Sequence, residues 1–244
     1  MIAKAFVEND AKVYIASRSL KSCERKAQEL SAQGPGECVP LEANLDSEQG
    51  CLALAKELSS RGDALHVLVN NSGASWGEPM ESYPDQAWDK LWNLNVKSIF
   101  TLTRACLPLL DADPGRVINI GSIAGLMPQP VPTYAYDASK AAVHMLTKKL
   151  AGELADRRAD GGHAITVNAI APCFVPSRMS NQLLTYVPEE VVSKGIPMGR
   201  LGTAEDMGGA ALYLASRAGA WVTGTVLTVD GGTTAQPLSM EPKL

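Results

Sequence analysis

The sequence predicts a single α/β domain built on a doubly wound parallel sheet with helices on both faces. Short apolar runs alternate with amphipathic helical patterns along nearly all of the 244 residues, which is typical of strands joined by helical crossovers. The chain contains no internal repeat, low-complexity stretch or convincing linker. A chain of this length fits one α/β domain with a substantial core.

The expected strands are short runs of mainly apolar residues. In chain order they are Lys12–Ala16, Cys38–Leu41, Leu65–Asn70, Arg116–Ile120, Ala164–Ile170 and Val226–Val229. Near-continuous apolar runs of this kind indicate strands that are buried on both faces, as in a parallel sheet.

Helical patterns occupy the segments between these runs, at about residues 20–31, 47–60, 85–111, 134–158 and 204–216. Asp46 with Gln49, and Thr203 with Asp206, have the spacing of a capping box. In that motif the side chains of the first and fourth residues satisfy amide groups at a helix start. We therefore expect helices to begin at these two places.

Composition and charge exclude several function classes. The net charge of −4 and the pI near 5.5 argue against a nucleic-acid-binding surface, which requires clustered positive charge. No apolar run approaches the roughly 18 residues of a membrane span, and no signal-peptide pattern opens the chain. We expect neither a nucleic-acid partner nor a membrane association.

Cysteines and histidines give no pattern of a metal site. The cysteines are odd in number, widely scattered and without a Cys-x-x-Cys pair, at positions Cys23, Cys38, Cys51, Cys106 and Cys173. This usage suits reduced thiols in a cytoplasmic protein. The three histidines are too dispersed to form an evident ligand set, so no metal is expected.

The most informative motif is Tyr136-Asp137-Ala138-Ser139-Lys140, with Ser122 upstream. Residues four apart lie one above the other on a helix, so Lys140 would hold its charge beside the Tyr136 hydroxyl. A nearby cation lowers the pKa of a phenol, and such a phenol can exchange a proton with an alcohol or ketone oxygen. Ser122 can hydrogen-bond the same oxygen. The alternative is a solvated Tyr–Lys pair on a helix surface.

Polar candidates also follow three expected strands. Asn70-Asn71-Ser72-Gly73 comes after one strand, Gly121-Ser122 after the next, and the loop from Pro172 to Ser177 after a third. Ligands of open parallel sheets bind beyond the carboxyl ends of the strands. We therefore expect these segments to meet at one rim.

Taken together, these motifs resemble the short-chain dehydrogenase/reductase family, over nearly the whole chain from Met1 to about Thr233. The resemblance rests on an ordered set: Asn70-Asn71-Ser72-Gly73, Asn95, Ser122, Tyr136-x-x-x-Lys140, Pro172 and Val229-Asp230-Gly231-Gly232. It implies a Rossmann-like fold, a nicotinamide cofactor, and a homo-oligomer formed through the long helices at 85–111 and 134–158.

The resemblance also implies roles for the catalytic set. Tyr136 matches the general acid/base, and Lys140 matches the residue that lowers the pKa of this tyrosine and holds the nicotinamide ribose. Ser122 matches the residue that orients the substrate carbonyl. Asn95 matches the residue that supports a water-mediated proton path; the alternative for it is a helix-surface amide.

Cofactor choice is expected to depend on Arg18. An acidic residue at this point binds the adenosine ribose of NAD, whereas an arginine accommodates the phosphate of NADP. Ser17 adds a donor beside it, and Asn44 and Leu45 match positions near the adenine. We therefore expect NADP; the alternative for Arg18 is an exposed arginine at a helix start.

At the other end of the cofactor, Asn71 and Gly73 match positions beneath the dinucleotide, where a missing side chain allows close approach. The alternative for Asn70-Asn71 is a turn-forming pair that ends a strand. Val175 and Ser177 match positions at the nicotinamide end, with a plain loop as the alternative.

The family's glycine-rich phosphate-binding turn is missing from the pattern. It would precede a segment like Met1–Phe6, so the first, central strand and its turn are expected to be absent, and NADPH binding to be weak. Two smaller departures are Asp10, which stands where a glycine usually precedes the second strand, and Cys173, where a glycine usually follows the proline.

These observations predict an NADPH-dependent oxidoreductase that reduces a ketone or 3-oxoacyl group, or catalyses the reverse reaction on an alcohol. The stretches from Asn71 to Gly77, Tyr134 to Tyr136 and Pro176 to Met179 resemble the branch related to 3-oxoacyl-thioester reductases. The alternative is a catalytically silent family member that serves as an interaction subunit.

Overall fold

The structure is a computed structural model that describes residues 1–236 except 63, 111–114, 157–163, 178 and 182–186. Every predicted strand is present, with boundaries that differ from the prediction by a few residues at most. The strands are β1 (Lys12–Ser17), β2 (Glu37–Glu42), β3 (Val67–Asn70), β4 (Arg116–Ile120), β5 (Thr166–Pro172) and β6 (Val226–Val229).

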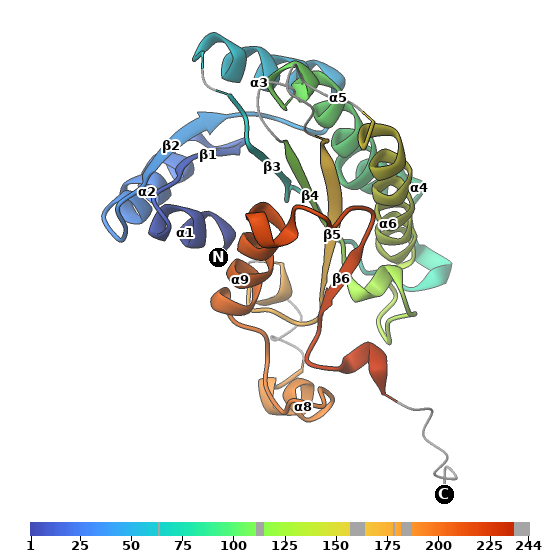
Figure 1. Ribbon diagram of the computed structural model, residues 1–244. Coiled ribbons are helices and arrows are strands. Elements are labelled where there is room, and N and C mark those ends of the chain that lie inside the picture. The colour runs from blue at the N-terminus through green and yellow to red at the C-terminus, as the bar shows by residue number, and fades with distance from the viewer. Residues whose placement is uncertain (63, 111–114, 157–163, 178, 182–186, 237–244) are drawn as a thin grey trace, which may run out of the picture.

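All strand pairs are parallel, but the strands form two sheets. One has the order β1-β2 and the other the order β3-β4-β5-β6; in Figure 1 the first pair stands to the left of the larger sheet. Within the described part of the chain, no strand joins β1 to β3.

Helices lie between the strands as predicted. They are α1 (Ile2–Glu8), α2 (Leu20–Ser31), α3 (Glu48–Ser60), α4 (Asp85–Trp92), α5 (Ser98–Leu110), α6 (Tyr134–Leu154), α8 (Glu189–Lys194) and α9 (Ala204–Ala215). The helix predicted at 85–111 is α4 followed by a π-helical segment (Asn93–Lys97) and α5. The helices α1 and α8 were not predicted from the sequence, because seven and six residues make too few turns for a periodic pattern.

Helices cover both faces of the larger sheet (Figure 1). On one face α3, α5 and α6 pack against Val117 and Val167, and on the other α9 packs against Ile118 and Ile170. Val117 and Ile118 are neighbours on β4 and both are buried. A strand that is buried on both faces is the expected signature of a doubly wound sheet, so the predicted fold class is confirmed.

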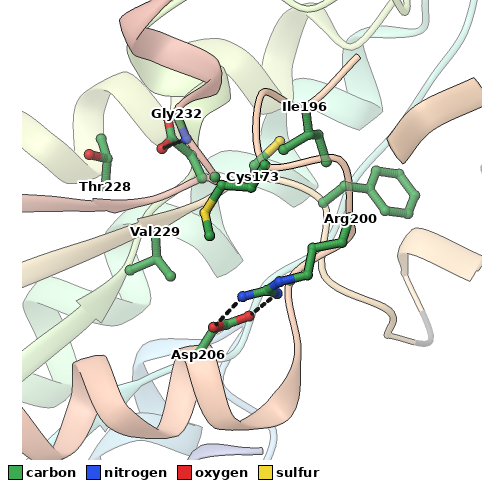
Figure 2. A pocket seen from close by; sticks show the side chains of 12 residues that line it. Cys173, Ile196, Arg200, Asp206, Thr228, Val229 and Gly232 are labelled. Atoms are coloured by element: carbon green, nitrogen blue, oxygen red, sulfur yellow. Dashed lines mark hydrogen bonds and ion pairs between the residues drawn. The ribbon is translucent and has the colours of Figure 1, made fainter. Parts of the chain in front are cut away.

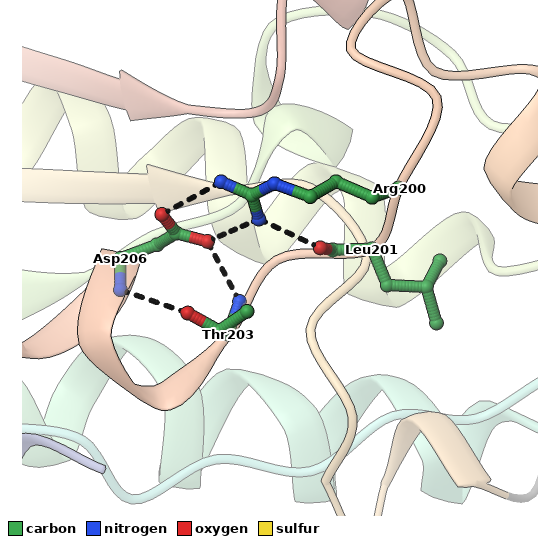
Figure 3. Close-up of polar contacts among 4 residues, drawn as sticks. All are labelled: Arg200, Leu201, Thr203 and Asp206. Atoms are coloured by element: carbon green, nitrogen blue, oxygen red, sulfur yellow. Dashed lines mark hydrogen bonds and ion pairs between the residues drawn. The ribbon is translucent and has the colours of Figure 1, made fainter.

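The capping-box prediction is right for one helix and wrong for the other. At α9 the Thr203 hydroxyl accepts from the Asp206 amide, and the Asp206 carboxylate accepts from the Thr203 amide and from Arg200 (Figure 3). At α3 the capping residue is Ser47, which accepts from the Gly50 amide, rather than the predicted Asp46. Both residues can cap a helix, and the path of the chain decides between them.

Among the described helices, none combines the length and apolarity needed to cross a bilayer. In the same residues, no three His, Cys, Asp or Glu side chains are grouped closely enough to hold a metal ion. Arg178, in the Pro176–Met179 motif, lies outside the described residues, as does the end of the helix predicted at 134–158 beyond residue 156.

Candidate active site

Three strand ends meet at one rim. Because β3, β4 and β5 are neighbouring parallel strands, Asn71–Gly73, Gly121–Ser122 and Cys173–Ser177 all leave the same edge of the larger sheet. The predicted convergence is therefore confirmed.

A chain of buried amides and hydroxyls supports this rim from below. The Asn70 side chain donates to Asn119 Oδ1 at 2.9 Å and to Thr103 Oγ1 at 3.2 Å. The Asn119 side chain in turn donates to Thr147 Oγ1 at 2.9 Å. Buried polar groups need such partners, and these bonds tie β3 and β4 to α5 and α6.

Tyr136 and Lys140 lie one turn apart on the same side of α6, with the Lys140 ammonium 5.6 Å from the centre of the Tyr136 ring. Lys140 is only 6% exposed, and its Nζ donates to the Ile120 carbonyl at the end of β4 at 2.7 Å. The alternative of a solvated surface pair is therefore wrong for Lys140. Tyr136 itself is half-buried and retains access to solvent.

The expected lowering of the Tyr136 pKa is wrong for this structure. Burial raises the pKa of Tyr136, a hydrogen bond with the Ser122 hydroxyl acts in the opposite direction, and the Asp137 carboxylate raises it further. The Lys140 ammonium is directed at the Ile120 carbonyl instead of the phenol oxygen. The phenol consequently keeps its proton at neutral pH, which suits a general acid.

Burial lowers the pKa of Lys140 to about 8. A desolvated ammonium is less stable than a solvated one, but at this value most of the Lys140 side chains remain charged at pH 7. The site therefore presents a neutral phenol and a cationic amine to the same rim.

The Ser122 hydroxyl is held in place by the backbone that follows it. It accepts from the Ala124 amide at 3.1 Å. The Ser122 amide points to His144 Nε2 at 3.5 Å, one turn beyond Lys140 on α6. Burial, together with the charge of Lys140, lowers the pKa of His144 to about 4, so this imidazole is neutral. Its place beside Ser122 has no signature in the sequence.

Glycine is required beside this imidazole. A Cβ on Gly121 would lie 2.3 Å from His144 Nε2, well inside van der Waals contact. The close approach of β4 to α6 at Ser122 thus depends on the missing side chain.

Asn95 is fully buried in the π-helical segment, so the alternative of a helix-surface amide is wrong. Its Oδ1 accepts from the Ala74 amide at 2.9 Å, and its Nδ2 donates to the Ala74 carbonyl at 3.0 Å and to Ser139 Oγ at 2.9 Å. Ser139, which the sequence analysis did not assign, donates to the Tyr136 carbonyl at 2.7 Å. Asn95 thereby links the loop after β3 to the turn that carries Tyr136.

The residues expected at the adenosine end lie on the smaller sheet. Ser17 ends β1 and Arg18 follows it, both exposed, while Asn44 and Leu45 follow β2. Because β1 and β2 are paired in parallel, these positions share one edge. They do not belong to the sheet that carries Ser122.

The residues expected near the nicotinamide lie on the loops after β3 and β5, and they differ in how far they are buried. A Cβ on Gly73 would lie 3.2 Å from Asn95 Oδ1 and 3.8 Å from Lys140 Nζ, so the missing side chain lets the loop approach both groups closely. Asn71 is exposed on the same segment. Val175 is buried against Gly202, and the Ser177 hydroxyl contacts that of Ser180 at 2.9 Å.

A cavity of about 270 Å³ lies beside the end of β6 (Figure 2). Its lining includes Cys173, Ile196, Arg200 and Gly232, and the Arg200–Asp206 ion pair crosses one side. Ser122, Tyr136 and Lys140 are not among its lining residues. The catalytic candidates and this cavity are thus different features of the same rim.

Comparison with known proteins gives consistent results. A family model described as Enoyl-(Acyl carrier protein) reductase matches residues 1–234. The rhamnolipids biosynthesis 3-oxoacyl-[acyl-carrier-protein] reductase of Pseudomonas aeruginosa is 43% identical over 238 residues, which cover 95% of this chain and 90% of that protein. The 3-oxoacyl-[acyl-carrier-protein] reductase FabG of Chlamydia trachomatis is 33% identical, with the same coverage.

Solved structures agree with these matches. The Pseudomonas aeruginosa RhlG/NADP active-site complex superposes with a TM-score of 0.87 at 43% identity, covering 95% of this chain and 90% of that one. A putative NAD(P)-dependent gluconate 5-dehydrogenase from Beutenbergia cavernae with bound NADP gives 0.86 at 32% identity, covering 96% and 91%.

A parallel α/β sheet with a Ser–Tyr–Lys set at its carboxyl rim defines the class of nicotinamide-dependent oxidoreductases. The chain belongs to the short-chain dehydrogenase/reductase family within this class.

Proposed function

We propose that this protein uses NADPH to reduce a ketone or 3-oxoacyl group to an alcohol, with Tyr136 as the general acid. The observation that carries the proposal is the Tyr136 phenol one helical turn from the buried Lys140 ammonium, which lies 5.6 Å from the centre of the Tyr136 ring, at the rim where Ser122 follows β4. The 3-oxoacyl-[acyl-carrier-protein] reductase of Pseudomonas aeruginosa supports the substrate class.

The described residues fit an NADP cofactor at its two ends. Lys140 would hold the nicotinamide ribose, Gly73 brings the backbone of its loop close to the Lys140 ammonium, and Asn71, Val175 and Ser177 would border the same end. Arg18 and Ser17 would receive the adenosine phosphate, because an exposed guanidinium recognises phosphate well; Asn44 and Leu45 would lie near the adenine. The NADP complex of RhlG supports this choice of cofactor.

The proposed chemistry at the carbonyl oxygen follows from the site. When bound, NADPH supplies the hydride that adds to the carbonyl carbon. The Ser122 hydroxyl donates to the carbonyl oxygen and orients it, and Tyr136 transfers its proton to that oxygen as negative charge develops. Lys140 is cationic at neutral pH and stabilises the phenolate that remains. In the reverse direction Tyr136 would accept the proton of the alcohol hydroxyl, and NADP⁺, when bound, would accept the hydride from the carbinol carbon.

Asn95 organises the site in this scheme. Its side-chain amide is engaged with Ala74 and Ser139, so we assign it the role of holding the loop after β3 against α6. The water-mediated proton path that the family resemblance implies for Asn95 stays a prediction.

The alternative of a catalytically silent interaction subunit has one observation in its favour. The sheet is divided between β1 and β3, at the place where a central strand and a glycine-rich turn would seat the cofactor pyrophosphate. The complete Ser122, Tyr136 and Lys140 set argues against a silent role, because a purely structural chain does not need a buried ammonium beside a phenol.

We also infer a cytoplasmic homo-oligomer. Trp92 at the end of α4, Phe100 near the start of α5 and Met145 on α6 are large apolar side chains that lie exposed. Burying them between copies would be favourable. Light scattering tests this association: a dimer or tetramer is expected, and a strictly monomeric chain would contradict it. The cytoplasmic assignment rests on the odd, scattered cysteines.

The function is tested with a 3-oxoacyl thioester and NADPH. Tyr136→Phe should remove nearly all turnover, since the ring remains but no proton can be donated. Tyr134→Phe is the matched control, because it removes a hydroxyl two residues away on the same helix and should keep wild-type turnover. Circular dichroism confirms that both variants fold. An active Tyr136→Phe variant would refute the assignment, and an inactive wild-type chain that binds no NADPH would favour the silent alternative.

A further inference from the structure

Tyr83 bridges two segments of the proposed site, the loop after β3 and the first turn of α6. It lies just after a short 3-10 helix (Met80–Ser82) and before α4. Its hydroxyl accepts from the Ala135 amide at 3.3 Å and donates to the Trp76 carbonyl at 3.4 Å. Ala135 is the neighbour of Tyr136, and Trp76 lies three residues beyond Gly73. One phenol thus connects the general-acid helix to the loop after β3.

The Ala135 amide depends on an outside partner. The first amides of a helix have no acceptor within the helix, and the side chain of the N-cap residue Thr133 makes no capping bond. The Thr133 hydroxyl donates instead to the Asp137 carboxylate at 2.9 Å. Tyr83 therefore supplies, from 52 positions earlier in the chain, an acceptor that a local cap would normally provide.

Aromatic packing holds the Tyr83 ring in place for this role. The ring meets Tyr134 edge to face at 5.3 Å and 81°, and Trp88 at 6.4 Å and 64°. Edge-to-face contacts of this kind are attractive and directional. The ring is half-buried, and burial raises the pKa of Tyr83, so its hydroxyl keeps the proton that it donates to Trp76.

The loop end of the bridge is also held by neighbouring contacts. The Lys90 ammonium lies 5.3 Å from the centre of the Trp76 ring, and the Glu78 amide donates to the Pro132 carbonyl at 3.1 Å. Asn95 holds Ala74 on the inner side of the same loop. Tyr83 provides the outer tie, and the two ties together fix the loop against the first turns of α6.

We propose that Tyr83 is a positioning residue for the reduction, whose hydroxyl sets the first turn of α6, and with it Tyr136, against the loop after β3. The inference rests on the proposed function, since it assigns Tyr83 to the same reaction. It predicts an effect on the proton-transfer step with little effect on the distant adenosine-binding positions.

The test compares Tyr83→Phe with Tyr134→Phe, a matched loss of one hydroxyl from the same aromatic cluster. For Tyr83→Phe we expect kcat with a 3-oxoacyl thioester to fall about 5- to 20-fold, the range for losing one or two neutral hydrogen bonds. The KM for NADPH should stay within about twofold. Amide exchange of Ala135, measured by NMR, should accelerate in Tyr83→Phe and stay unchanged in Tyr134→Phe.

Several outcomes would overturn the inference. These are a Tyr83→Phe variant with wild-type kcat, a variant with unchanged Ala135 exchange, and equal losses in both variants, which would assign the effect to ring packing. An inactive wild-type chain would refute the proposed function and this inference together. An active wild-type chain with an unaffected Tyr83→Phe variant would refute the inference alone.

Discussion

Asn95 binds the backbone of Ala74 twice, accepting from its amide at 2.9 Å and donating to its carbonyl at 3.0 Å. The buried side chain thus pairs with the loop as a neighbouring strand would. Its remaining N–H reaches Ser139, which bonds the Tyr136 carbonyl. The three hydrogen bonds of the Asn95 side chain therefore hold the loop after β3 against the turn of α6 that carries Tyr136.

Replacing Asn95 with Ala should therefore damage stability and turnover together. The substitution empties the buried position of the Asn95 amide and leaves the part-buried Ala74 amide and carbonyl, and Ser139, without this partner. We therefore expect the free energy of unfolding to fall by about 2–4 kcal/mol. Urea unfolding measures this loss. Asn93→Ala, in the same π-helical segment at a half-buried position, is the control and should cost less than about 1 kcal/mol. Equal costs for the two variants would contradict the bridging role.

Lys140 should give the activity a pH dependence. Its pKa is lowered to about 8 by burial, so the ammonium loses its proton as the pH rises through this value. Because the cation stabilises the phenolate of Tyr136 in the proposed reduction, kcat/KM should decline above about pH 8. A profile that stays flat up to pH 10 would contradict the assignment.

Lys140 should also give the stability a pH dependence of opposite sign. In the unfolded chain the lysine keeps its proton up to about pH 10.5, whereas the folded chain releases it near 8. The unfolded state binds more protons between these values, so the free energy of unfolding rises with pH there, by roughly 2–4 kcal/mol in total. Lys140→Met should lack this rise in urea unfolding measured across the window.

Replacing Asp10 with glycine should stabilise the fold. It follows α1 with φ at +62°, a backbone conformation that costs a side chain about 1 kcal/mol and costs glycine little. Asp10→Gly should therefore raise the free energy of unfolding by up to about 1 kcal/mol. The paired control is Gly152→Ala inside α6, where the added Cβ meets nothing within 4 Å and helix propensity predicts a similar gain. A destabilised Asp10→Gly variant would contradict the account of α1 and β1.

The division of the sheet should limit cofactor affinity. We expect the 244-residue chain to bind NADPH at least tenfold more weakly than the same chain extended by roughly 20 residues that supply a strand and a glycine-rich turn. Titration of nucleotide fluorescence measures both affinities. An extension of equal length without glycines in the turn is the control. Equal affinities for all three chains would show that the described rim is sufficient.

Sequence patterns predicted the features that depend on local spacing. The six strands, the long helices and the placement of Tyr136 above Lys140 follow from periodicity, and the ends of β3, β4 and β5 meet at one rim as expected. The capping residue predicted for α3 was wrong. Asp46 and Ser47 can both cap a helix, and only the path of the chain makes Ser47 the cap.

Features that depend on distant contacts could not be predicted in this way. The raised pKa of Tyr136 comes mainly from burial, which spacing on one helix does not report. The contacts of Tyr83 with Ala135, and of Asn95 with Ser139, join residues 52 and 44 positions apart. Neither pair has a sequence signature, so only the fold shows that these residues serve the Tyr136 segment.

Transfer of a labelled hydride tests the central claim most directly. The wild-type chain and Tyr136→Phe are incubated with NADPH deuterated at the transferable C4 position and a 3-oxoacyl thioester, and the product is analysed by mass spectrometry. We predict a 3-hydroxyacyl product with one deuterium on the carbinol carbon for the wild type, and almost none for Tyr136→Phe. An undeuterated or absent product from wild-type protein saturated with cofactor, or equal labelled product from both proteins, would contradict the account.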